Sequence, residues 1–344
     1  MDSISFPVHE YMPREAKLFW CGWPEFNPFL KAVFSDFTFV DSRYGGKSET
    51  SGPDDILAIS QGSCTIGDAF QGNTLYIDGE DGQVQISKQE DIPKLHYLGI
   101  DRQPTAPVKA WMWMPYMILE IVANANMKSG NELAVLDRAA AALPAKSRES
   151  APDKFLVYMN SNCKPHRENF YDELYDAALA AGVSLPVAAG KCHGSKPATA
   201  DYKNDRGNRF NTAIDHLAPY RFAIVMENGK VPGYVTEKIA QAFSANTIPI
   251  YFGASAVFEH FNEDSFIYVD VNDAEAQTAA VARIIELEQD PVAYEAMLRQ
   301  PIIKEPVRDT LEKYFSITDE VGGGQLKKRI REMLQIEDDW HTRF

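Results

Sequence analysis

The chain has 344 residues, a net charge of −15, and 45% hydrophobic and 24% charged residues. These values are ordinary for a globular protein and leave room for two domains of usual size. The negative charge argues against a general nucleic-acid-binding protein, which normally presents a basic surface. Residues 191–240 hold eight lysines and arginines against five acids. This segment suggests a local anionic ligand, with chance clustering on a solvated loop as the alternative.

No apolar run approaches the roughly 20 residues that a membrane-spanning helix needs. The first residues lack a basic region followed by an apolar region, so we expect no signal peptide and a cytoplasmic protein. The four cysteines, Cys21, Cys64, Cys163 and Cys192, form no CxxC pair. We therefore expect free thiols in a reducing compartment.

The first half of the chain alternates short apolar runs with turns, which predicts a series of strands. The expected strands are residues 18–20, 37–40, 56–60, 75–77 and 96–100, with helices at 26–34 and 132–143. The polar segment 144–153 contains two prolines, and we place a domain boundary there.

The second half predicts a further strand and helix series, α/β in class. The expected strands are residues 155–159, a strand from 187, 221–226, 247–252 and 266–269, and the expected helices are 168–180, 237–245, 274–287 and 327–334. We predict two Rossmann-like domains across a cleft, at 1–150 and 151–325, and a helical tail at 326–344. The basic helix 327–334 is either docked on the protein or a weak peripheral membrane contact, at the inner membrane face if the source is bacterial.

Lys238 stands in the first turn of the predicted helix 237–245, which Thr236 caps. A cation at this end of a helix is mildly unfavourable. The conflict disappears if an anion binds there, because backbone N–H groups and the lysine then hold it together. The alternative is that Lys238 extends into solvent. In a parallel sheet this position lies at the carboxyl ends of the strands, where ligands bind.

Several common motifs are absent. The sequence has no GxGxxG, HExxH, GxSxG or Asp-x-Asp pattern and no close cluster of histidine and cysteine. These absences argue against a dinucleotide fingerprint, a zinc protease and a simple serine hydrolase. We also expect no metal ligands, because the acidic pair that holds a divalent ion in many sugar-nucleotide enzymes is missing.

The string Glu227-Asn228, five residues, then Tyr234-Val235-Thr236-Glu237-Lys238 resembles the α1,3-fucosyltransferase family, especially its bacterial and viral members. The segments 167–174 and 264–267 fit the same family, and 75–81 and 96–101 fit it more weakly. The resemblance implies a GT-B fold and transfer of L-fucose from GDP-fucose to a GlcNAc-containing glycan, with an α1,3 linkage. It implies no metal cofactor.

The same resemblance assigns roles to individual residues. Arg167 and Lys238 are expected at the donor phosphates, since inversion without a metal needs fixed cations against the departing diphosphate. Glu237 is expected at the ribose hydroxyls. The remaining donor-site candidates are Glu227, Asn228, Tyr234, Val235, Thr236 and Lys191.

Each assignment has a structural alternative. Arg167 could form a surface ion pair, and Glu237 could merely complement the helix dipole. Tyr234 could pack in the core, Asn228 could shape the loop, and Glu227 could anchor that loop rather than engage fucose.

The resemblance also implies that Glu80 is the general base; this residue follows a strand on a turn marked by Gly79, in the half expected to hold the acceptor. Asp78 or Asp81 could raise its pKa, and an ordinary turn acid is the alternative. Trp111, Trp113 and Tyr116 could stack on acceptor sugars or pack in the core.

Two competing functions stay open from the sequence. One is a glycosyltransferase that uses another nucleotide sugar, and the other is a non-catalytic protein that binds glycans or nucleotides.

Overall fold

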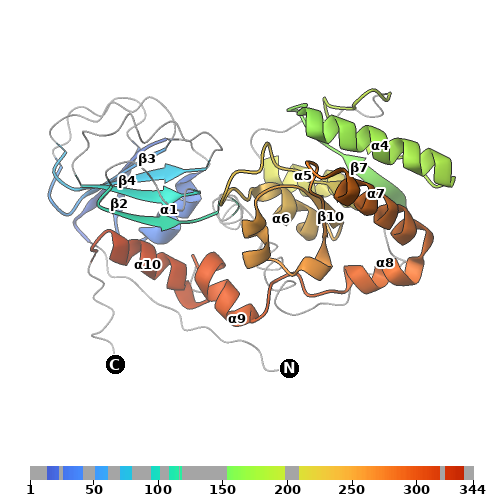
Figure 1. The fold of residues 1–344 in the computed structure, drawn as a ribbon. Helices are drawn as coiled ribbons and strands as arrows, with labels where there is room; N and C mark the ends of the chain where they lie inside the picture. Colours follow the sequence, from blue (N-terminus) through green and yellow to red (C-terminus); the bar gives the residue numbers. More distant parts are fainter. Residues whose placement is uncertain are drawn as a thin grey trace. The chain divides into compact units, whose positions relative to one another are not determined.

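The structure is a computed structural model. It describes residues 14–22, 26–41, 51–60, 70–79, 94–100, 108–115, 117, 153–197, 209–317 and 322–336. The chain divides into two compact units (Figure 1). The first contains Met1–Ser129, Pro232–Tyr234 and Pro306–Phe344, and the second contains Gly130–Val231 and Val235–Glu305.

The first unit is built on a parallel six-stranded sheet in the order β2-β1-β3-β4-β5-β6. Its strands are β1 (Lys17–Cys21), β2 (Thr38–Asp41), β3 (Ile56–Ser60), β4 (Asn73–Asp78), β5 (Leu95–Gly99) and β6 (Ala110–Trp113). The five predicted strands are confirmed to within two residues. Strand β6 was not predicted, because it is a short edge strand without a buried, alternating pattern. The predicted helix 132–143 lies outside the described residues.

Short helices complete the first unit. Those in the described residues include α1 (Asn27–Val33), α9 (Val307–Thr310), a π-helical turn (Leu311–Phe315) and α10 (Gln325–Met333). Helix α10 packs on α1 (Figure 1) and on β6. Two of its four cations, Lys327 and Arg331, are buried, so they are not available to a membrane surface. Among the helices that the structure describes, none combines the length and apolarity that crossing a bilayer requires.

A buried ion pair fixes α10 in place. Arg331 donates from Nη1 and Nη2 to the two carboxylate oxygens of Asp36, both at 2.8 Å, and Arg14 donates to Asp36 at 2.7 Å. Burial alone would raise the pKa of Asp36, but the hydrogen bonds and charge of Arg331, helped by Arg14, lower it below its ordinary value. The pair ties the end of the chain to the segment after α1.

The second unit is a doubly wound α/β domain with a parallel five-stranded sheet in the order β11-β10-β9-β7-β8. Its strands are β7 (Lys154–Tyr158), β8 (Val187–Ala188), β9 (Tyr220–Ile224), β10 (Ile248–Tyr251) and β11 (Ile267–Tyr268). Its helices are α4 (Pro165–Ala181), α5 (Arg209–Leu217), α6 (Glu237–Ser244), α7 (Ala274–Gln289) and α8 (Pro291–Leu298). Helices α4 and α7 pack together, as do α5 and α6 (Figure 1).

This strand order places a topological switch point between β7 and β9. The chain leaves β7 toward β8 on one side, and it leaves β9 toward β10 on the other. In open parallel sheets, ligands bind outside the carboxyl ends of the two strands at such a point. The loops 159–164 and 225–236 follow these two strands.

The Asp36 pair generates a stability prediction. Asp36→Asn leaves the Arg331 guanidinium buried without its counter-charge, so we expect the free energy of unfolding to fall by about 3–5 kcal/mol. Urea denaturation followed by circular dichroism measures this loss. The contribution should be complete above pH 3.8 and vanish as the pH falls through the lowered folded pKa of Asp36.

The control is Glu332→Gln, which removes an exposed partner 3.8 Å from Lys328 on the same helix. We expect it to change the free energy of unfolding by less than about 1 kcal/mol. Equal losses in the two variants would show that the buried pair does not hold α10.

Candidate functional site

The candidate site is assembled from the loops at the switch point and the first turns of the helices that follow them. The β7–α4 loop contributes Asn162, and the first turn of α4 contributes Arg167. The β9–α6 loop contributes Glu227 and Asn228, and the first turn of α6 contributes Lys238. Segments about 60 residues apart in sequence therefore meet at one edge of the sheet.

Arg167 joins the two loops. Its side chain is fully buried, and it donates to the backbone oxygens of Asn162 and Met226 and to Oδ1 of Asn228 at 3.2 Å. The side chain of Asn162 also donates to Asn228 Oδ1, at 3.3 Å. A surface ion pair for Arg167 is therefore wrong. The guanidinium therefore links the β7–α4 loop to the β9–α6 loop, and it places a positive charge at the candidate site.

Glu227, near the start of the β9–α6 loop, connects this loop to its neighbours by hydrogen bonds. Its carboxylate is fully buried, and it accepts from the backbone N and the hydroxyl of Thr236, both at 2.7 Å. It also accepts from the hydroxyl of Tyr251 at 3.3 Å and from Lys238 Nζ at 3.4 Å. One side chain thus connects the end of β9, the start of α6 and the end of β10, which agrees with an anchoring role for Glu227.

Thr236 occupies the N-cap position of α6, as predicted, but it makes no side-chain capping bond. Its hydroxyl instead lies 2.7 Å from Glu227 Oε2 and 2.8 Å from Lys238 Nζ. The first N–H groups of a helix have no intrahelical acceptor. The start of α6 therefore combines a helix N-terminus with a neighbouring ammonium group, the arrangement that suits an anion.

Lys238 lies among opposing charges. Its Nζ is 3.4 Å from a carboxylate oxygen of Glu227 and 3.4 Å from one of Glu237, and its side chain is 22% exposed. Burial lowers the pKa of Lys238, but the two carboxylates outweigh this effect and raise it. Lys238 is therefore a partly accessible, fully charged cation, and it does not simply extend into solvent.

The other donor-site candidates differ in exposure. Tyr234 and Val235 are buried, which agrees with core packing for Tyr234. Lys191 is exposed in the loop after β8, the strand that flanks β7 on the side away from β9. Tyr251 was missed by sequence reasoning. It could have been found as a polar residue at the carboxyl end of the strand next to β9.

Glu80 lies outside the described residues, so its role as a base stays a prediction. The described strand β4 ends two residues earlier at Asp78, which is buried and accepts from the hydroxyl of Tyr97 at 3.2 Å. Trp111 is 47% exposed. Trp113 donates to the backbone oxygen of Gly233 and packs edge-on against Tyr314. Tyr116 lies outside the described residues.

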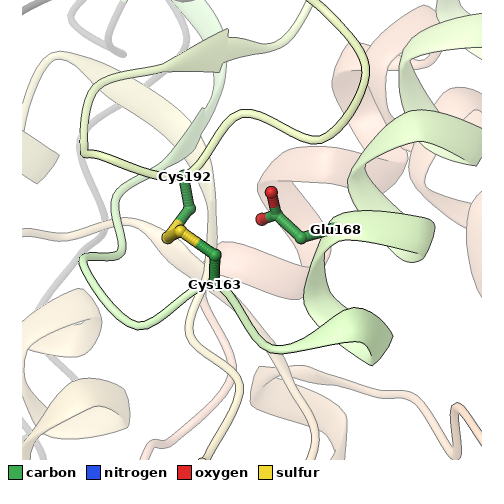
Figure 2. Close-up of side chains that lie close together, drawn as sticks. All are labelled: Cys163, Glu168 and Cys192. Carbon is green, nitrogen blue, oxygen red and sulfur yellow. A yellow bond between two sulfur atoms is a disulfide. The ribbon is translucent and has the colours of Figure 1, made fainter.

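The structure corrects the prediction that the cysteines are free thiols. Cys163 and Cys192 form a disulfide between the β7–α4 loop and the loop after β8 (Figure 2). Cys21 is also disulfide-bonded. The expectation of free thiols is therefore wrong for these three residues, because 29 residues separate the first pair and only the parallel packing of β7 and β8 brings it together. Disulfides are typical of oxidising compartments rather than of the cytoplasm.

Glu168 completes the same corner. It accepts from the hydroxyl of Tyr158 and from the backbone N of Gly194, the latter at 2.8 Å. With the two cysteines it forms the one group of possible metal ligands found among the described residues (Figure 2). The disulfide occupies both sulfur atoms, and Glu168 makes hydrogen bonds with both oxygens. In this state the corner serves as a clamp on the loop that carries Lys191.

Removing the clamp should lower stability. Cys163→Ala/Cys192→Ala opens a loop of about 30 residues, so we expect the free energy of unfolding to fall by about 2–4 kcal/mol. Urea denaturation measures the change, and mass spectrometry of unreduced peptides checks the bond. The comparison is made with the oxidised wild type, because reductant would also break the disulfide of Cys21. A double variant as stable as the oxidised wild type would contradict the prediction.

Comparison with known proteins shows what the part of the chain that carries this site is similar to. Residues 150–299 match the family model described as the C-terminal region of glycosyltransferase family 10 (fucosyltransferase). An α-(1,3)-fucosyltransferase of Helicobacter pylori is 37% identical over 153 residues, which cover 44% of this chain and 28% of that protein. A protein of Acanthamoeba polyphaga mimivirus named as a fucosyltransferase is 31% identical over 172 residues, 48% of this chain and 27% of its own length.

The match to curated relatives therefore covers little more than a quarter of their lengths. At the level of structure, a crystal structure of an α1,3-fucosyltransferase aligns over 98% of this chain and 95% of its own, with a TM-score of 0.62 and 18% identity. This likeness shows that the fold is GT-B, as predicted. Residues 150–299 of this chain are thus similar to the C-terminal region of glycosyltransferase family 10, the fucosyltransferases.

Proposed function

We propose that the chain is an inverting fucosyltransferase that transfers L-fucose from GDP-β-L-fucose to a hydroxyl of a GlcNAc-containing glycan. The observation that carries the proposal is the position of Lys238 and the α6 N-terminus at the switch point of a domain similar to family 10. A solved α1,3-fucosyltransferase of the same fold, with a TM-score of 0.56, is described with GDP-fucose.

The diphosphate is the part of the donor that this site suits best. As the glycosidic bond breaks, negative charge grows on the departing phosphate. Lys238 supplies a partly exposed ammonium group, the α6 N-terminus supplies backbone N–H groups, and the nearby Arg167 adds charge. These fixed groups can act without a divalent metal, and metal independence is part of the proposal.

The rest of the donor is assigned to neighbouring residues. Glu237 stands in the first turn of α6 with a 16% exposed side chain, and its carboxylate suits the ribose diol. Asn228, held by Asn162 and Arg167, lies on the loop beside it and is assigned to the sugar. Lys191 is assigned to the guanine or phosphates through the clamped loop.

We assign the general base to the first unit, which is the half expected to bind the acceptor. Inversion requires in-line attack by an acceptor hydroxyl and removal of its proton. Glu80 follows β4 of the parallel sheet in the first unit, and we assign this step to it. The exposed Trp111 on β6 offers a face for stacking against a sugar.

The α1,3 linkage is proposed from the H. pylori relative and the solved structures. An α-(1,4)-fucosyltransferase of Arabidopsis thaliana is also 31% identical over 148 residues, 41% of this chain and 36% of that protein. Product analysis with a Galβ1,4GlcNAc and a Galβ1,3GlcNAc acceptor separates the two. Fucose on the 3-hydroxyl of the first supports the α1,3 assignment, and product with the second alone refutes it.

The first functional prediction concerns Lys238. Lys238→Met should weaken GDP binding about 10- to 100-fold, since a hydrogen bond to a charged group contributes roughly 1.5–3 kcal/mol. Calorimetry measures the affinity, and UDP and CDP should compete poorly with GDP. The matched control is Lys230→Met, because Lys230 is a half-exposed lysine of the β9–α6 loop, which precedes α6, and it pairs with Asp270 on the surface. Tight UDP binding without GDP binding would favour a different donor.

The second prediction concerns Glu80. Glu80→Gln should lower kcat by about 10²- to 10⁴-fold, because the base is removed. GDP affinity should stay within about twofold, because the residue belongs to the other unit. Asp81→Asn serves as the neighbouring control. Unchanged turnover in Glu80→Gln would remove Glu80 as the base, and no turnover in the wild type with any glycan acceptor would favour a non-catalytic binding protein.

A further inference from the structure

Glu227 is an unexpected residue to find beneath an anion site. Its carboxylate is fully buried, and it lies 3.4 Å from the ammonium group of Lys238. A negative charge at this position opposes a diphosphate placed on the same lysine. The residue therefore needs an explanation beyond anchoring the loop.

The four hydrogen-bond partners of Glu227 can all act as donors, an arrangement that suits an ionised carboxylate. Oε1 accepts from Thr236 N and the Tyr251 hydroxyl, and Oε2 accepts from the Thr236 hydroxyl and Lys238 Nζ. Among these four partners the one cation is Lys238, which Glu237 shares at 3.4 Å. A buried charge is expensive to keep once its counter-ion is engaged elsewhere.

A bound diphosphate would compete with Glu227 for that counter-ion. We propose that Glu227 takes up one proton from solvent when the donor diphosphate takes over Lys238, so that donor binding is coupled to protonation of this buried acid. This inference rests on the proposed function, since it places the diphosphate on Lys238.

The Thr236 hydroxyl allows the exchange without leaving a polar atom unsatisfied. In the free protein Lys238 donates to Thr236 Oγ1 at 2.8 Å, and this hydroxyl donates to Glu227 Oε2 at 2.7 Å. Once Lys238 turns to the phosphate, the neutral Glu227 can donate its own proton to Thr236 Oγ1, whose hydrogen becomes available to the phosphate. Oε1 keeps its two donors throughout.

One neighbouring charge favours this direction, because the carboxylate of Glu237 raises the pKa of Glu227. Lys238 and Glu237 face the site from α6, Arg167 and His166 from α4, and Tyr251 from β10.

Burial raises the pKa of Glu227 and Lys238 opposes the rise, so loss of the Lys238 contact raises it further. The pKa of His166 is lowered by burial, which leaves its ring neutral around pH 8.

The test counts protons directly. GDP is titrated calorimetrically at about pH 8 into the wild type and into Glu227→Gln, in two buffers that differ in ionisation enthalpy. A phosphate ester is fully ionised there, because its second pKa is about 6, so the ligand itself contributes no proton. We expect the wild type to take up as much as one proton more than the variant. Between pH 7 and 9 its GDP affinity should fall by up to about tenfold per unit, with a flatter profile in Glu227→Gln.

Guanosine, which lacks phosphate, provides a control that needs no variant. Its binding to the wild type should take up no proton, so a proton taken up with GDP but not with guanosine supports the coupling even if Glu227→Gln fails to fold. Equal proton counts for GDP and guanosine, or for wild type and a folded Glu227→Gln, would overturn it. Absence of GDP binding to the wild type would instead refute the proposed function and this inference with it.

Discussion

The contact between the Glu227 carboxylate and the start of α6 organises the whole candidate site. Through two 2.7 Å bonds it fixes Thr236, and through Thr236 it fixes the direction in which Lys238 points. Without such an acceptor, a lysine in the first turn of a helix would be electrostatically misplaced. In the free protein, the negative charge of Glu227 offsets the unfavourable position of Lys238 at the helix N-terminus. The positive charge of Lys238 in turn offsets the cost of burying Glu227.

The topology of the second unit decides where this contact can act. Because β9 lies beside β7, the β9–α6 loop that carries Glu227 lies next to the β7–α4 loop. Arg167 connects the two loops by hydrogen bonds to both. The Cys163–Cys192 bond then fixes the loop after β8 to the same corner. Each of the three loops follows a parallel strand, so their shared edge is a consequence of the strand order.

The sequence predicted the local part of this arrangement well. The strand, loop, helix and strand around residues 221–252 follow from apolar runs and loop residues, and Lys238 was identified by its conflict with the helix dipole. The buried position of Arg167 could not be predicted, since its acceptor on Met226 lies 59 residues away. The disulfide was missed for the same reason. The Thr236 hydroxyl was expected to cap its own helix, but its oxygen accepts from Lys238 Nζ and its hydrogen is donated to the Glu227 carboxylate.

The most direct measurement of the central claim is a crystal structure of the chain with GDP, grown in EDTA. The account predicts the diphosphate at the N-terminus of α6, with a phosphate oxygen within hydrogen-bonding distance of Lys238 Nζ and no metal between them. A nucleotide bound elsewhere, or a diphosphate beside a Lys238 that points away from it, would contradict the account.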